Sequence, residues 1–586
     1  MAAEAQEDAK SVEEVKTFEG LLRLVGTRGR WNIILFLLCA YSTFVSPMQS
    51  LSYQFLGATP DHWCHVEPLV SAGWSEEQIL SIAIPVNNET GKPEHCLMYN
   101  SNFSSALERG YEWAQNNPQI FDQSEVVSCS SRDFNGSQYR STVTTEWDLV
   151  CDRRVLYSTT QAAVQAGKLV GYVFLGYLLD TFGRRPVTLA CSALSIISGF
   201  LAAASPNVEF YIFVKIIITC MMSGVYLGCF ISVMEACSAK QRDYVGPLFV
   251  LPWALGYMVV PGIAYLIRDW KPLQAALTTP ALVLVVFYFL LPESPRWLIL
   301  KGRHKEALEV LHRAARLNGR TLPPDQQVIA AMERIANSDT NKESQEKARE
   351  SLSQRALNVA KTFFILLTTP SLRVRALIAF FCWFAASMVY YGVALNATNL
   401  SADPYIYLFL GGLMEVPSYI LLWPAIKFLG RVKSLAILYF VCGASIIVVM
   451  FLMLYVPTVP VGVTVFFSLC GKMAITAAFH LIWLFTAELF PTKYRSLAVG
   501  EASVCARVGS ICSPYINDIL GEVVTWAPSA LFGIVSLVAA GLSLLLPETK
   551  NRELPETADF FEKKGETNAA YEAGEKGQDG GKVELS

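Results

Sequence analysis

The chain consists largely of long apolar runs separated by short polar segments. Most runs reach about 20 residues, the length that a helix needs to cross a lipid bilayer. We predict twelve spans, at residues 31–52, 155–179, 187–205, 209–236, 246–267, 273–291, 376–396, 404–424, 434–455, 461–487, 497–517 and 527–546. The pattern therefore predicts an all-α membrane protein.

The spans form two groups of six that carry the same short motifs about 250 residues apart. Gly183-Arg184 returns as Gly430-Arg431, Glu235 returns as Glu488, and Pro292-Glu293-Ser294 returns as Pro547-Glu548-Thr549. Each copy lies at the end of an apolar run, so the repeated unit is a bundle of membrane helices. Two bundles that face each other across a central cavity predict a transporter that works by alternating access.

Charge placement orients these spans. Of the 586 residues, 53% are hydrophobic and 17% are charged, as is typical of membrane proteins. Lys and Arg gather in short loops on one side, at residues 184–185, 240–242, 427–433 and 493–495, whereas the opposite short loops hold only Arg268 and Lys271. Because basic short loops stay in the cytoplasm, we predict both termini there. Residues 1–10 are acidic and are not expected to form a cleavable signal, so the first span is expected to remain as an anchor.

The polar segments predict the domain organisation. We expect a cytoplasmic N-terminus at 1–30, an extracellular loop at 53–154, a cytoplasmic helical loop at 292–375 and a disordered tail at 547–586, with six-span bundles formed by 31–52 plus 155–291 and by 376–546. The extracellular loop contains glycosylation sequons at Asn88, Asn102 and Asn135. It also contains Cys64, Cys96, Cys129 and Cys151. Four cysteines in an oxidising compartment predict two disulfides, in any of three pairings.

Residues Gly176–Pro186 resemble the loop motif between helices 2 and 3 of the major facilitator superfamily. The resemblance implies that Asp180 pairs with the Arg cluster and latches the two bundles in one state. In the second copy Lys427 stands where the Asp would be, so we expect a weaker or different latch there. The implied gating residues are Asp180, Arg184, Arg185, Glu235, Arg242, Arg431, Glu488 and Arg495.

Three further segments, Gly57–Cys64, Pro292–Leu298 and Thr486–Thr492, resemble the organic cation, anion and carnitine transporter family. The resemblance covers roughly residues 30 to 550 and implies a plasma-membrane carrier of six plus six helices. Gly256–Pro261, Ile267–Trp270, Met414–Tyr419, Gly471-Lys472 and Thr476–Phe479 look most like the carnitine and zwitterion branch.

Two positions bear on the charge of the substrate. Arg507 lies where carnitine and organic-anion carriers keep an Arg and where cation carriers keep an Asp. Tyr419 stands where carriers that exchange dicarboxylates tend to have a Lys. The combination favours one carboxylate contact, and therefore a zwitterion or a mono-anion.

Arg507 lies near the middle of the eleventh predicted span, on one helical face with Ser503 and Ser510. A guanidinium binds a carboxylate through two parallel hydrogen bonds, so we interpret Arg507 as a contact for a substrate carboxylate. The alternative is a permanent pair with an acid on another helix. Glu415 is interpreted either as a counter-ion for a substrate ammonium or as a partner of Lys168 or Arg507.

Aromatic residues on three spans could surround a quaternary ammonium group through cation–π contacts, although such stripes also form ordinary packing. They are Trp253 and Tyr257 on the fifth span, Tyr390 and Tyr391 on the seventh, and Phe479 and Trp483 on the tenth, beside Lys472. The resemblance favours Phe479, Trp483 and Tyr257, whose positions match cavity-lining aromatics of carnitine-type carriers.

Lys168 lies on a polar face of the second span with Ser158, Gln161, Gln165 and Tyr172, at a position that is apolar in the family pattern. It could be a second anion contact, a proton-coupling group or a structural partner of Glu415, and we favour the structural pair. The candidate substrate-binding residues are Arg507, Glu415, Phe479, Trp483, Tyr257, Trp253, Tyr390, Tyr391, Lys472, Lys168, Gln165 and Tyr419.

Glu235 and Glu488 are interpreted as gating latches rather than ion-coupling groups. We expect no cofactor, and the coupling ion, where there is one, to be Na⁺ or H⁺. Ser46 replaces the Asn that carnitine carriers tend to have, which argues against sodium coupling.

An enzyme is not expected, because the six histidines are scattered and no phosphate-binding loop or metal-spaced cluster is present in the sequence. We expect a monomer in the lipid bilayer that takes a small organic ion and no nucleic acid or metal. The substrate type would be that of carnitine, carcinine or betaine. The alternatives are an organic-anion exchanger and a non-transporting receptor on a transporter scaffold.

Overall fold

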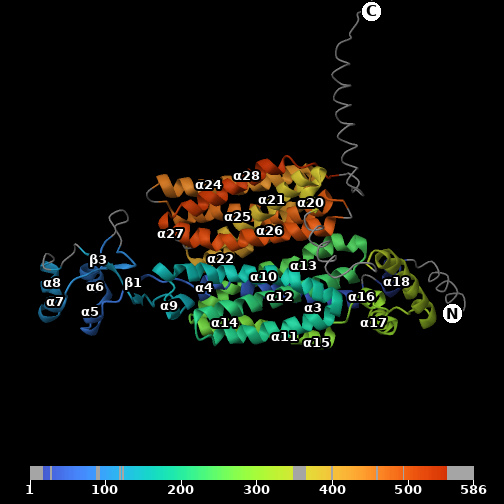
Figure 1. Ribbon diagram of the computed structural model, residues 1–586, viewed down its shortest axis with the longest axis horizontal. Helices are drawn as coiled ribbons and strands as arrows, with labels where there is room; N and C mark the ends of the chain where they lie inside the picture. The colour runs from blue at the N-terminus through green and yellow to red at the C-terminus, as the bar shows by residue number, and fades with distance from the viewer. Residues whose placement is uncertain are drawn as a thin grey trace, which may run out of the picture.

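The computed structural model describes residues 17–26, 29–86, 93–117, 121, 125–347, 365–396, 400, 402–456, 459–491 and 494–550. The predicted N-terminus before residue 17, the sequon at Asn88 and the tail after residue 550 lie outside these residues. Two helical bundles lie side by side, with a small mixed domain at one end and three helices, α16–α18, at the other (Figure 1).

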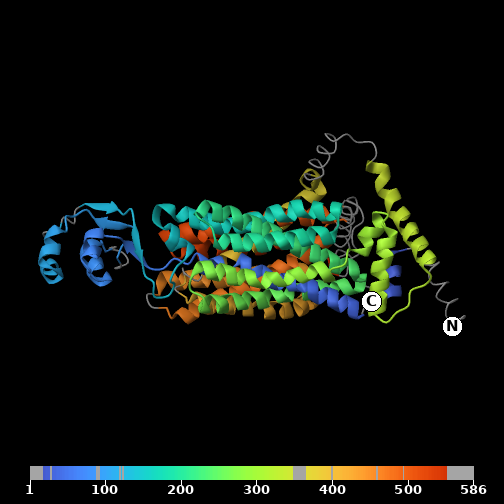
Figure 2. The same ribbon diagram turned by 90° about the horizontal axis from the view of Figure 1, so that it is seen from below.

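The first bundle contains the six spans of the N-terminal half. They are α3 (Arg30–Ser50) with α4 (Tyr53–Leu56), α10 (Arg154–Phe182), α11 (Arg184–Ala203), α12 (Val208–Ala236), α13 (Ala239–Leu266), and a sixth segment made of α14 (Trp270–Thr278), the 3₁₀ helix η3 (Thr279–Val286) and α15 (Phe287–Leu290). Figure 2 shows the same helices from below, running along the long axis of the molecule.

The second bundle repeats this arrangement. Its spans are α21 (Pro370–Ala394), α22 (Pro404–Leu413) with α23 (Glu415–Leu429), α24 (Arg431–Tyr455), α25 (Val461–Leu489), α26 (Arg495–Tyr515) continued by the π-helix η4 (Ile516–Leu520) and α27 (Gly521–Val523), and α28 (Ala527–Ser543).

Within the described residues, nine helices are long and apolar enough to cross a membrane by length and composition. The remaining three predicted spans do not meet these criteria, each for its own reason. The sixth is interrupted by η3, the eleventh carries Glu501 and Arg507 among small polar residues, and the twelfth, α28, has 17 residues. The twelve-span, all-α prediction is confirmed.

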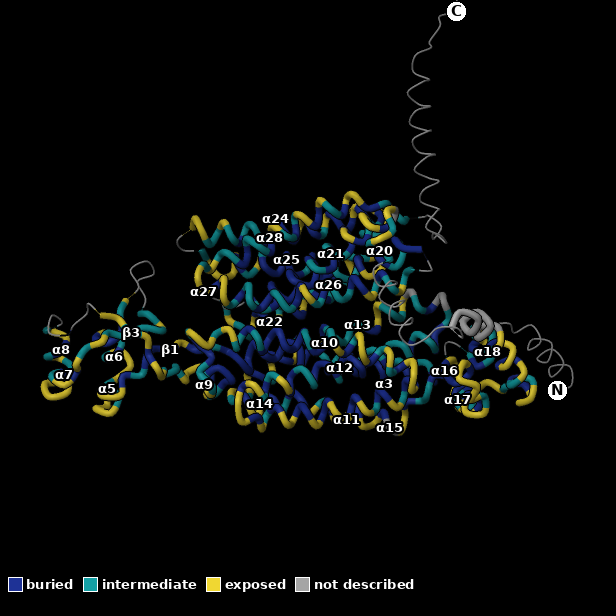
Figure 3. The backbone as a smooth tube through the Cα atoms, in the orientation of Figure 1, coloured by how far each residue is buried: buried dark blue, intermediate teal, exposed yellow. Residues whose placement is uncertain are grey.

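The spans place apolar side chains on both their inner and outer surfaces. Buried residues run along the interior and the interface between the bundles, and exposed residues lie on the outside (Figure 3). Large exposed apolar side chains such as Phe174, Ile197 and Phe440 lie on that outer surface. An outward apolar surface of this extent is typical of helices that face lipid.

Residues 57–153 form a separate domain, the loop domain, with its own small apolar core around Leu69, Ile79 and Ala106. Its elements are β1 (His62–Cys64), α5 (Glu67–Ser71), α6 (Glu76–Ala83), β2 (Leu97–Tyr99), α7 (Ser104–Arg109), α8 (Tyr111–Asn116), β3 (Val126–Ser128), β4 (Arg132–Phe134), α9 (Val143–Trp147) and η2 (Cys151–Arg153). The strands pair antiparallel as β1 with β4 and β2 with β3.

Two disulfides hold the loop domain together. They join Cys64 to Cys129 and Cys96 to Cys151, which selects one of the three pairings that the sequence allowed. Closing loops of this length restricts the unfolded chain, and a domain with so small a core gains much of its stability in this way. His62 lies beside Cys96 and Cys151, but both sulfurs are used in the disulfide and are not available to bind a metal.

At the opposite end of the bundles lie α2 (Phe18–Val25), α16 (Pro295–Leu300), α17 (His304–Leu317), α18 (Asp325–Lys347) and α20 (Ile365–Thr368). The amphipathic pattern of residues 304–317 forms α17, whose apolar face packs on α16 and α18. Asn318 attaches this group to the first bundle by donating to the backbone oxygens of Val25 and Gly26 and accepting from the Trp31 N–H.

Candidate functional site

The repeated motifs of the first bundle meet at the N-terminus of α11. The Arg184 guanidinium lies 3.0 Å from a carboxylate oxygen of Asp180 and 3.0 Å from one of Glu235. Glu293 accepts hydrogen bonds from the backbone N–H groups of Arg184, at 2.9 Å, and Arg185. The carboxylate of Glu293 therefore satisfies the free N–H groups at the start of α11 and interacts favourably with the helix dipole.

The second copy forms the same arrangement in the second bundle. Arg431 donates through Nε and Nη2 to the two carboxylate oxygens of Glu488, at 3.0 and 3.1 Å. Glu548 accepts from the backbone N–H groups of Arg431, at 2.9 Å, and Val432, at 3.1 Å. Three sequence motifs that are separated along the chain thus come together at one point in each bundle.

The position before each Arg requires glycine for two reasons: the backbone there has a positive φ, and a neighbouring carboxylate leaves no room for a Cβ. Gly183 has φ +107° and Gly430 has φ +88°, values that residues with a Cβ rarely adopt. A Cβ at Gly183 would overlap the carboxylate of Glu293, and a Cβ at Gly430 would lie 2.6 Å from Oε2 of Glu548.

The two capping carboxylates have opposite pKa shifts. Burial raises the pKa of Glu293 above its usual value, against the effect of the backbone hydrogen bonds that it accepts. Burial acts in the same direction on Glu548, but its backbone hydrogen bonds outweigh burial and hold the pKa of this carboxyl below its usual value.

The residues predicted to act as gates are brought together only in part. Asp180, Arg184 and Glu235 form one cluster and Arg431 and Glu488 another, each within a single bundle. The other gating candidates lie nearby: Arg242 donates to the backbone oxygen of Met234, Arg185 donates its N–H to Glu293, and Arg495 begins α26. The ammonium of Lys427 lies over the Trp423 ring, at 5.1 Å, rather than in the second cluster. Latching between the bundles by these residues stays a prediction.

Near the middle of the spans, Glu415, Lys472 and Tyr390 form a buried cluster in the second bundle. The Lys472 ammonium lies 3.6 Å from a carboxylate oxygen of Glu415, and both side chains are 1% exposed. The Tyr390 hydroxyl donates to the same carboxylate, and its ring centre lies 3.1 Å from the ammonium. This geometry corrects our interpretation that Glu415 pairs with Lys168 or Arg507. The reason is that α23 packs on α25, which carries Lys472, whereas Lys168 lies on α10, which packs on α26.

Lys168 instead contacts aromatic groups across the interface between the bundles. Its ammonium donates to the Tyr391 hydroxyl at 3.2 Å and lies 5.6 Å from the centre of the Trp253 ring. Trp253 in turn donates its indole N–H to the Tyr390 hydroxyl at 3.3 Å. These contacts connect the first bundle to the Glu415–Lys472 pair. The favoured structural pair of Lys168 with Glu415 is wrong.

Arg507 also contacts the opposite bundle. Its guanidinium carbon lies 4.9 Å from the centre of the Tyr172 ring on α10. Among the described residues, no carboxylate oxygen lies within 4.0 Å of Arg507 or of Lys168. The central cluster therefore holds three basic side chains and one carboxylate, and only Lys472 is paired with that carboxylate.

Aromatic side chains extend the cluster. Phe479 lies between Trp383, at a ring distance of 6.1 Å, and Tyr390, at 6.0 Å. Trp483 packs on Trp383 at 4.6 Å but is 44% exposed. Of the remaining aromatic candidates, Tyr257 is fully buried with its ring centre 5.5 Å from the Lys472 ammonium, and Tyr419 packs on His480.

On the loop-domain side of this cluster, α10 is joined to the end of the eleventh span. Ser158 donates to Asp518 at 3.0 Å, Arg154 pairs with Glu522 at 2.9 Å, and the hydroxyls of Thr159 and Tyr515 lie 3.1 Å apart. These contacts, like those of Lys168 and Trp253, lie between the middle of the spans and their loop-domain end.

Sequence reasoning missed three ionisable residues inside or beside the spans. Asp518 forms part of the contact just described, Glu501 is 4% exposed on α26, and Lys215 is fully buried and donates to Gln274 at 2.8 Å. The signal was present, because an ionisable residue inside an apolar run is by default a functional candidate. The rule that identified Lys168, Glu415 and Arg507 applies equally to Lys215 and Glu501.

Two bundles of six spans, repeated motifs at equivalent helix ends and a charged cluster between the bundles define a secondary transporter of the major facilitator superfamily. The fold comparison agrees. The structure is similar to the inward-open xylose transporter XylE of E. coli, with a TM-score of 0.56, 16% identity and coverage of 89% of this chain and 98% of that one.

Sequence comparisons give the family. Residues 101–561 match the family model described as "Sugar (and other) transporter". The chain is 32% identical to the organic cation transporter protein of Drosophila melanogaster, over 97% of this chain and 98% of the relative. It is 31% identical to the human organic cation/carnitine transporter 2, over 93% and 94%, and 29% identical to the Drosophila melanogaster beta-alanine transporter, over 92% and 88%.

The chain therefore belongs to the organic cation and carnitine transporter family, solute carrier family 22, within the major facilitator superfamily. It is a multi-pass membrane transporter and not an enzyme.

Proposed function

We propose that this transporter carries small organic ions that bear a carboxylate, and zwitterions of the carnitine or betaine type above all. The observation that carries the proposal is the charge of the central cluster. Lys168 and Arg507 have no carboxylate partner among the described residues, whereas Glu415 is engaged by Lys472 and Tyr390. A substrate carboxylate supplies the missing negative charge.

The aromatic residues suit the other end of a zwitterion. Trp253, Tyr390, Tyr391 and Phe479 lie together beside the basic side chains. Aromatic faces attract alkylated ammonium groups by about 0.5–2 kcal/mol each. Carnitine and β-alanine, which are named in two of the relatives, each combine an ammonium with a carboxylate.

Transport would follow alternating access in the plasma membrane. In this structure the contacts of Lys168, Trp253, Ser158 and Arg154 join the bundles from the middle of the spans toward the loop-domain end. We place that end outside the cell and both termini in the cytoplasm. Substrate release and rebinding then require these contacts to break while the opposite ends approach.

The deciding experiment is uptake of labelled carnitine, betaine, β-alanine and p-aminohippurate by expressing cells. We expect Arg507→Ala to lower uptake of the preferred zwitterion at least about tenfold, because the carboxylate loses a charge-assisted pair. Arg109→Ala, in which the lost guanidinium lies over Trp113 in the loop domain, is the matched control and should transport normally. Wild-type uptake by Arg507→Ala at equal surface expression would remove Arg507 from the site.

An organic mono-anion exchanger is the second candidate, and the excess of basic side chains in the cluster supports it. Preferential uptake of p-aminohippurate, stimulated by an anion loaded inside the cell, would establish it. Ligand binding without flux into liposomes would instead indicate a receptor.

A further inference from the structure

Two carboxylates lie in the interface between the bundles at its loop-domain end, and the proposed function does not yet use them. Asp518 lies in the π-helix η4, and its carboxylate accepts a hydrogen bond from Ser158 of α10 at 3.0 Å. Glu522 follows four residues later, in α27, and pairs with Arg154 of α10 at 2.9 Å. Both carboxylates therefore belong to the second bundle and both partners to the first. A π-helical turn is rare and frequently marks a functional position.

Asp518 has a hydroxyl group as its partner in place of a counter-ion. Within the part of the chain that the structure describes, no basic nitrogen lies within 4.0 Å of its carboxylate. The side chain of Glu522 is paired but 43% exposed. A carboxylate between packed helices is costly unless a positive charge meets it. The closed interface therefore holds more negative charge at this end than Arg154 neutralises.

Aromatic side chains flank the two carboxylates. Tyr515 precedes Asp518 by three residues, and its hydroxyl oxygen lies 3.1 Å from that of Thr159 on α10. Tyr157, next to the serine that contacts Asp518, packs its ring on Tyr53 at a centroid distance of 5.2 Å. Carboxylates and aromatic faces together are the groups that attract alkylated ammonium ions.

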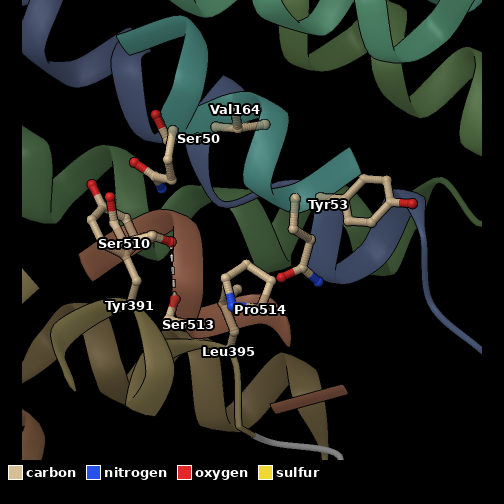
Figure 4. Close-up of a pocket in the computed structure, with 10 residues that line it drawn as sticks. Ser50, Tyr53, Val164, Tyr391, Leu395, Ser510, Ser513 and Pro514 are labelled. Carbon is tan, nitrogen blue, oxygen red and sulfur yellow. Dashed lines mark hydrogen bonds between the residues drawn. The ribbon is translucent and has the colours of Figure 1, made fainter. Parts of the chain in front are cut away.

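A small pocket continues from the carboxylates toward the middle of the spans. Its lining includes Gln161, Gln165, Ser510, Ser513 and Pro514. Figure 4 shows Val164 of α10 on one side and Ser513 and Pro514 on the other. Gln161 follows Ser158 by three residues, and Pro514 precedes Asp518 by four, so the pocket begins about one turn inward. Oε1 of Gln161 is buried there and has no hydrogen-bond partner among the described residues, which leaves an acceptor free in the pocket.

The charge along this interface changes sign between the loop-domain end and the middle of the spans. Lys168 follows Gln165 by three residues, and Arg507 precedes Ser510 by three, so basic groups lie at the inner end of the pocket. Asp518 follows Arg507 by eleven residues, about 16 Å along a helix that rises about 1.5 Å per residue. A small zwitterion is too short to contact both groups at once. It meets them in sequence instead.

From this geometry we infer that Asp518 is an outer recognition residue for the ammonium group of the substrate, in a site completed by Glu522 and Tyr515. The inference rests on the proposed function and deepens it. When the bundles open toward the loop domain, α10 moves away from η4 and α27, and both carboxylates lose their partners from the first bundle. Two carboxylates one turn apart then face the outer solution and attract a cation. The site selects alkylammonium cations and zwitterions over simple anions.

The same contacts give the substrate a reason to move inward. Arg154 and the Ser158 hydroxyl hold the carboxylates when the interface is closed, as in this structure. They therefore compete with the substrate ammonium, and closure requires the ammonium to leave. The next groups inward that accept it are Oε1 of Gln161 and the ring of Tyr391, both in the pocket lining. Arg154 is thus a tethered competitor that couples closure to movement of the substrate.

The test is inhibition of uptake by tetramethylammonium added outside cells that express the full-length protein. The labelled substrate is the compound of the uptake panel that the wild type transports best. Asn keeps the size of Asp and still accepts from Ser158, so Asp518→Asn removes the charge and preserves the closed contact. We expect Asp518→Asn to raise the inhibition constant of tetramethylammonium at least about fivefold. The inhibition constant of external p-aminohippurate should stay the same or fall, because a repelling charge is removed, and a folding defect does not produce this opposite response.

A second pair of variants tests the competitor. Arg154→Gln should lower the inhibition constant of tetramethylammonium, because the carboxylates lose their tethered cation, whereas Arg154→Lys should stay near the wild type. Glu146→Gln is the matched control: Glu146 pairs with Lys271 at 2.7 Å at the same end of the molecule, but both residues lie outside the interface between the bundles. It should inhibit like the wild type with both compounds.

Tetramethylammonium has no carboxylate, so its inhibition does not depend on Arg507 and is read separately from the Arg507→Ala uptake experiment. The inference is overturned if tetramethylammonium does not inhibit the wild type, or if Asp518→Asn leaves its inhibition constant unchanged at equal surface expression. An equal rise for tetramethylammonium and p-aminohippurate would also overturn it, since a general defect of the interface acts on both. Efflux from preloaded cells should keep its wild-type half-saturation in Asp518→Asn, and a fivefold rise there would contradict an outer site.

Discussion

Lys168, Lys472 and Arg507 gather around aromatic side chains at the middle of the spans, and Glu415 contacts only one of them. Burying a charge is expensive unless it is paired and hydrogen-bonded. Lys472 is paired with Glu415. Lys168 donates to the Tyr391 hydroxyl and lies near the Trp253 ring, and Arg507 lies over the Tyr172 ring. At the scale of single residues, this difference separates the structural pair of Lys472 and Glu415 from Lys168 and Arg507, which we propose bind the substrate carboxylate.

The Lys472–Glu415 pair leads to a prediction about stability. Lys472→Met should leave the Glu415 carboxylate buried without its counter-ion and destabilise the protein by about 3–5 kcal/mol. The double variant Lys472→Met/Glu415→Gln removes both charges and should recover most of that loss. The thermal unfolding midpoint of the purified variants measures this difference. Equal midpoints for the single and double variants would show that the two side chains are not energetically coupled.

At the scale of elements, the short connections between spans two and three and between spans eight and nine are built alike. In each, a glycine with positive φ precedes an Arg, and a Glu from the end of the same bundle caps the following helix. The repeat in the sequence is therefore a repeat of one local structure, held by backbone geometry as well as by ion pairs.

Gly430 tests that interpretation. Gly430→Ala should lower the unfolding temperature, because its φ of +88° strains an L-residue and the new Cβ would meet Glu548. Gly541→Ala is the control: Gly541 lies in α28 with open space around it, and Ala there should be neutral or stabilising by up to about 1 kcal/mol. Equal unfolding temperatures for the two variants would contradict the role assigned to Gly430.

At the scale of the whole molecule, the loop domain and α16–α18 lie at opposite ends of the bundles, so they must occupy opposite sides of the membrane (Figure 1). The sequons at Asn102 and Asn135 lie in the loop domain, and neither is buried. The basic connection between α10 and α11 lies at the α16–α18 end, since Trp297 of α16 donates to the backbone oxygen of Asp180. Both observations support the proposed orientation.

Glycosylation provides the test of orientation. We expect treatment with an N-glycosidase to increase the electrophoretic mobility of the wild type expressed in animal cells. The variant Asn88→Gln/Asn102→Gln/Asn135→Gln should already migrate at the faster position. An impermeant amine label should reach the loop domain on intact cells. Labelling of Lys305, the lysine of α17, instead of the loop domain would reverse the topology.

The sequence alone predicted the spans and revealed the duplication, because these depend on local properties, and its motifs indicated the class of carrier by resemblance. Runs of apolar residues reveal membrane helices whatever they pack against, and repeated motifs reveal a repeated unit. It also identified Lys168, Glu415, Lys472 and Arg507, since ionisable groups in apolar runs are conspicuous.

Only the tertiary structure decided which of these groups are partners. Glu415 meets Lys472 rather than Lys168 because pairing depends on which helices pack and which faces they turn to one another. The same holds for the disulfide pairing of the loop domain and for the pocket of Gln161, Gln165 and Ser513. Each brings together residues that are distant in the chain, and spacing along one helix contains no information about the helix across the interface.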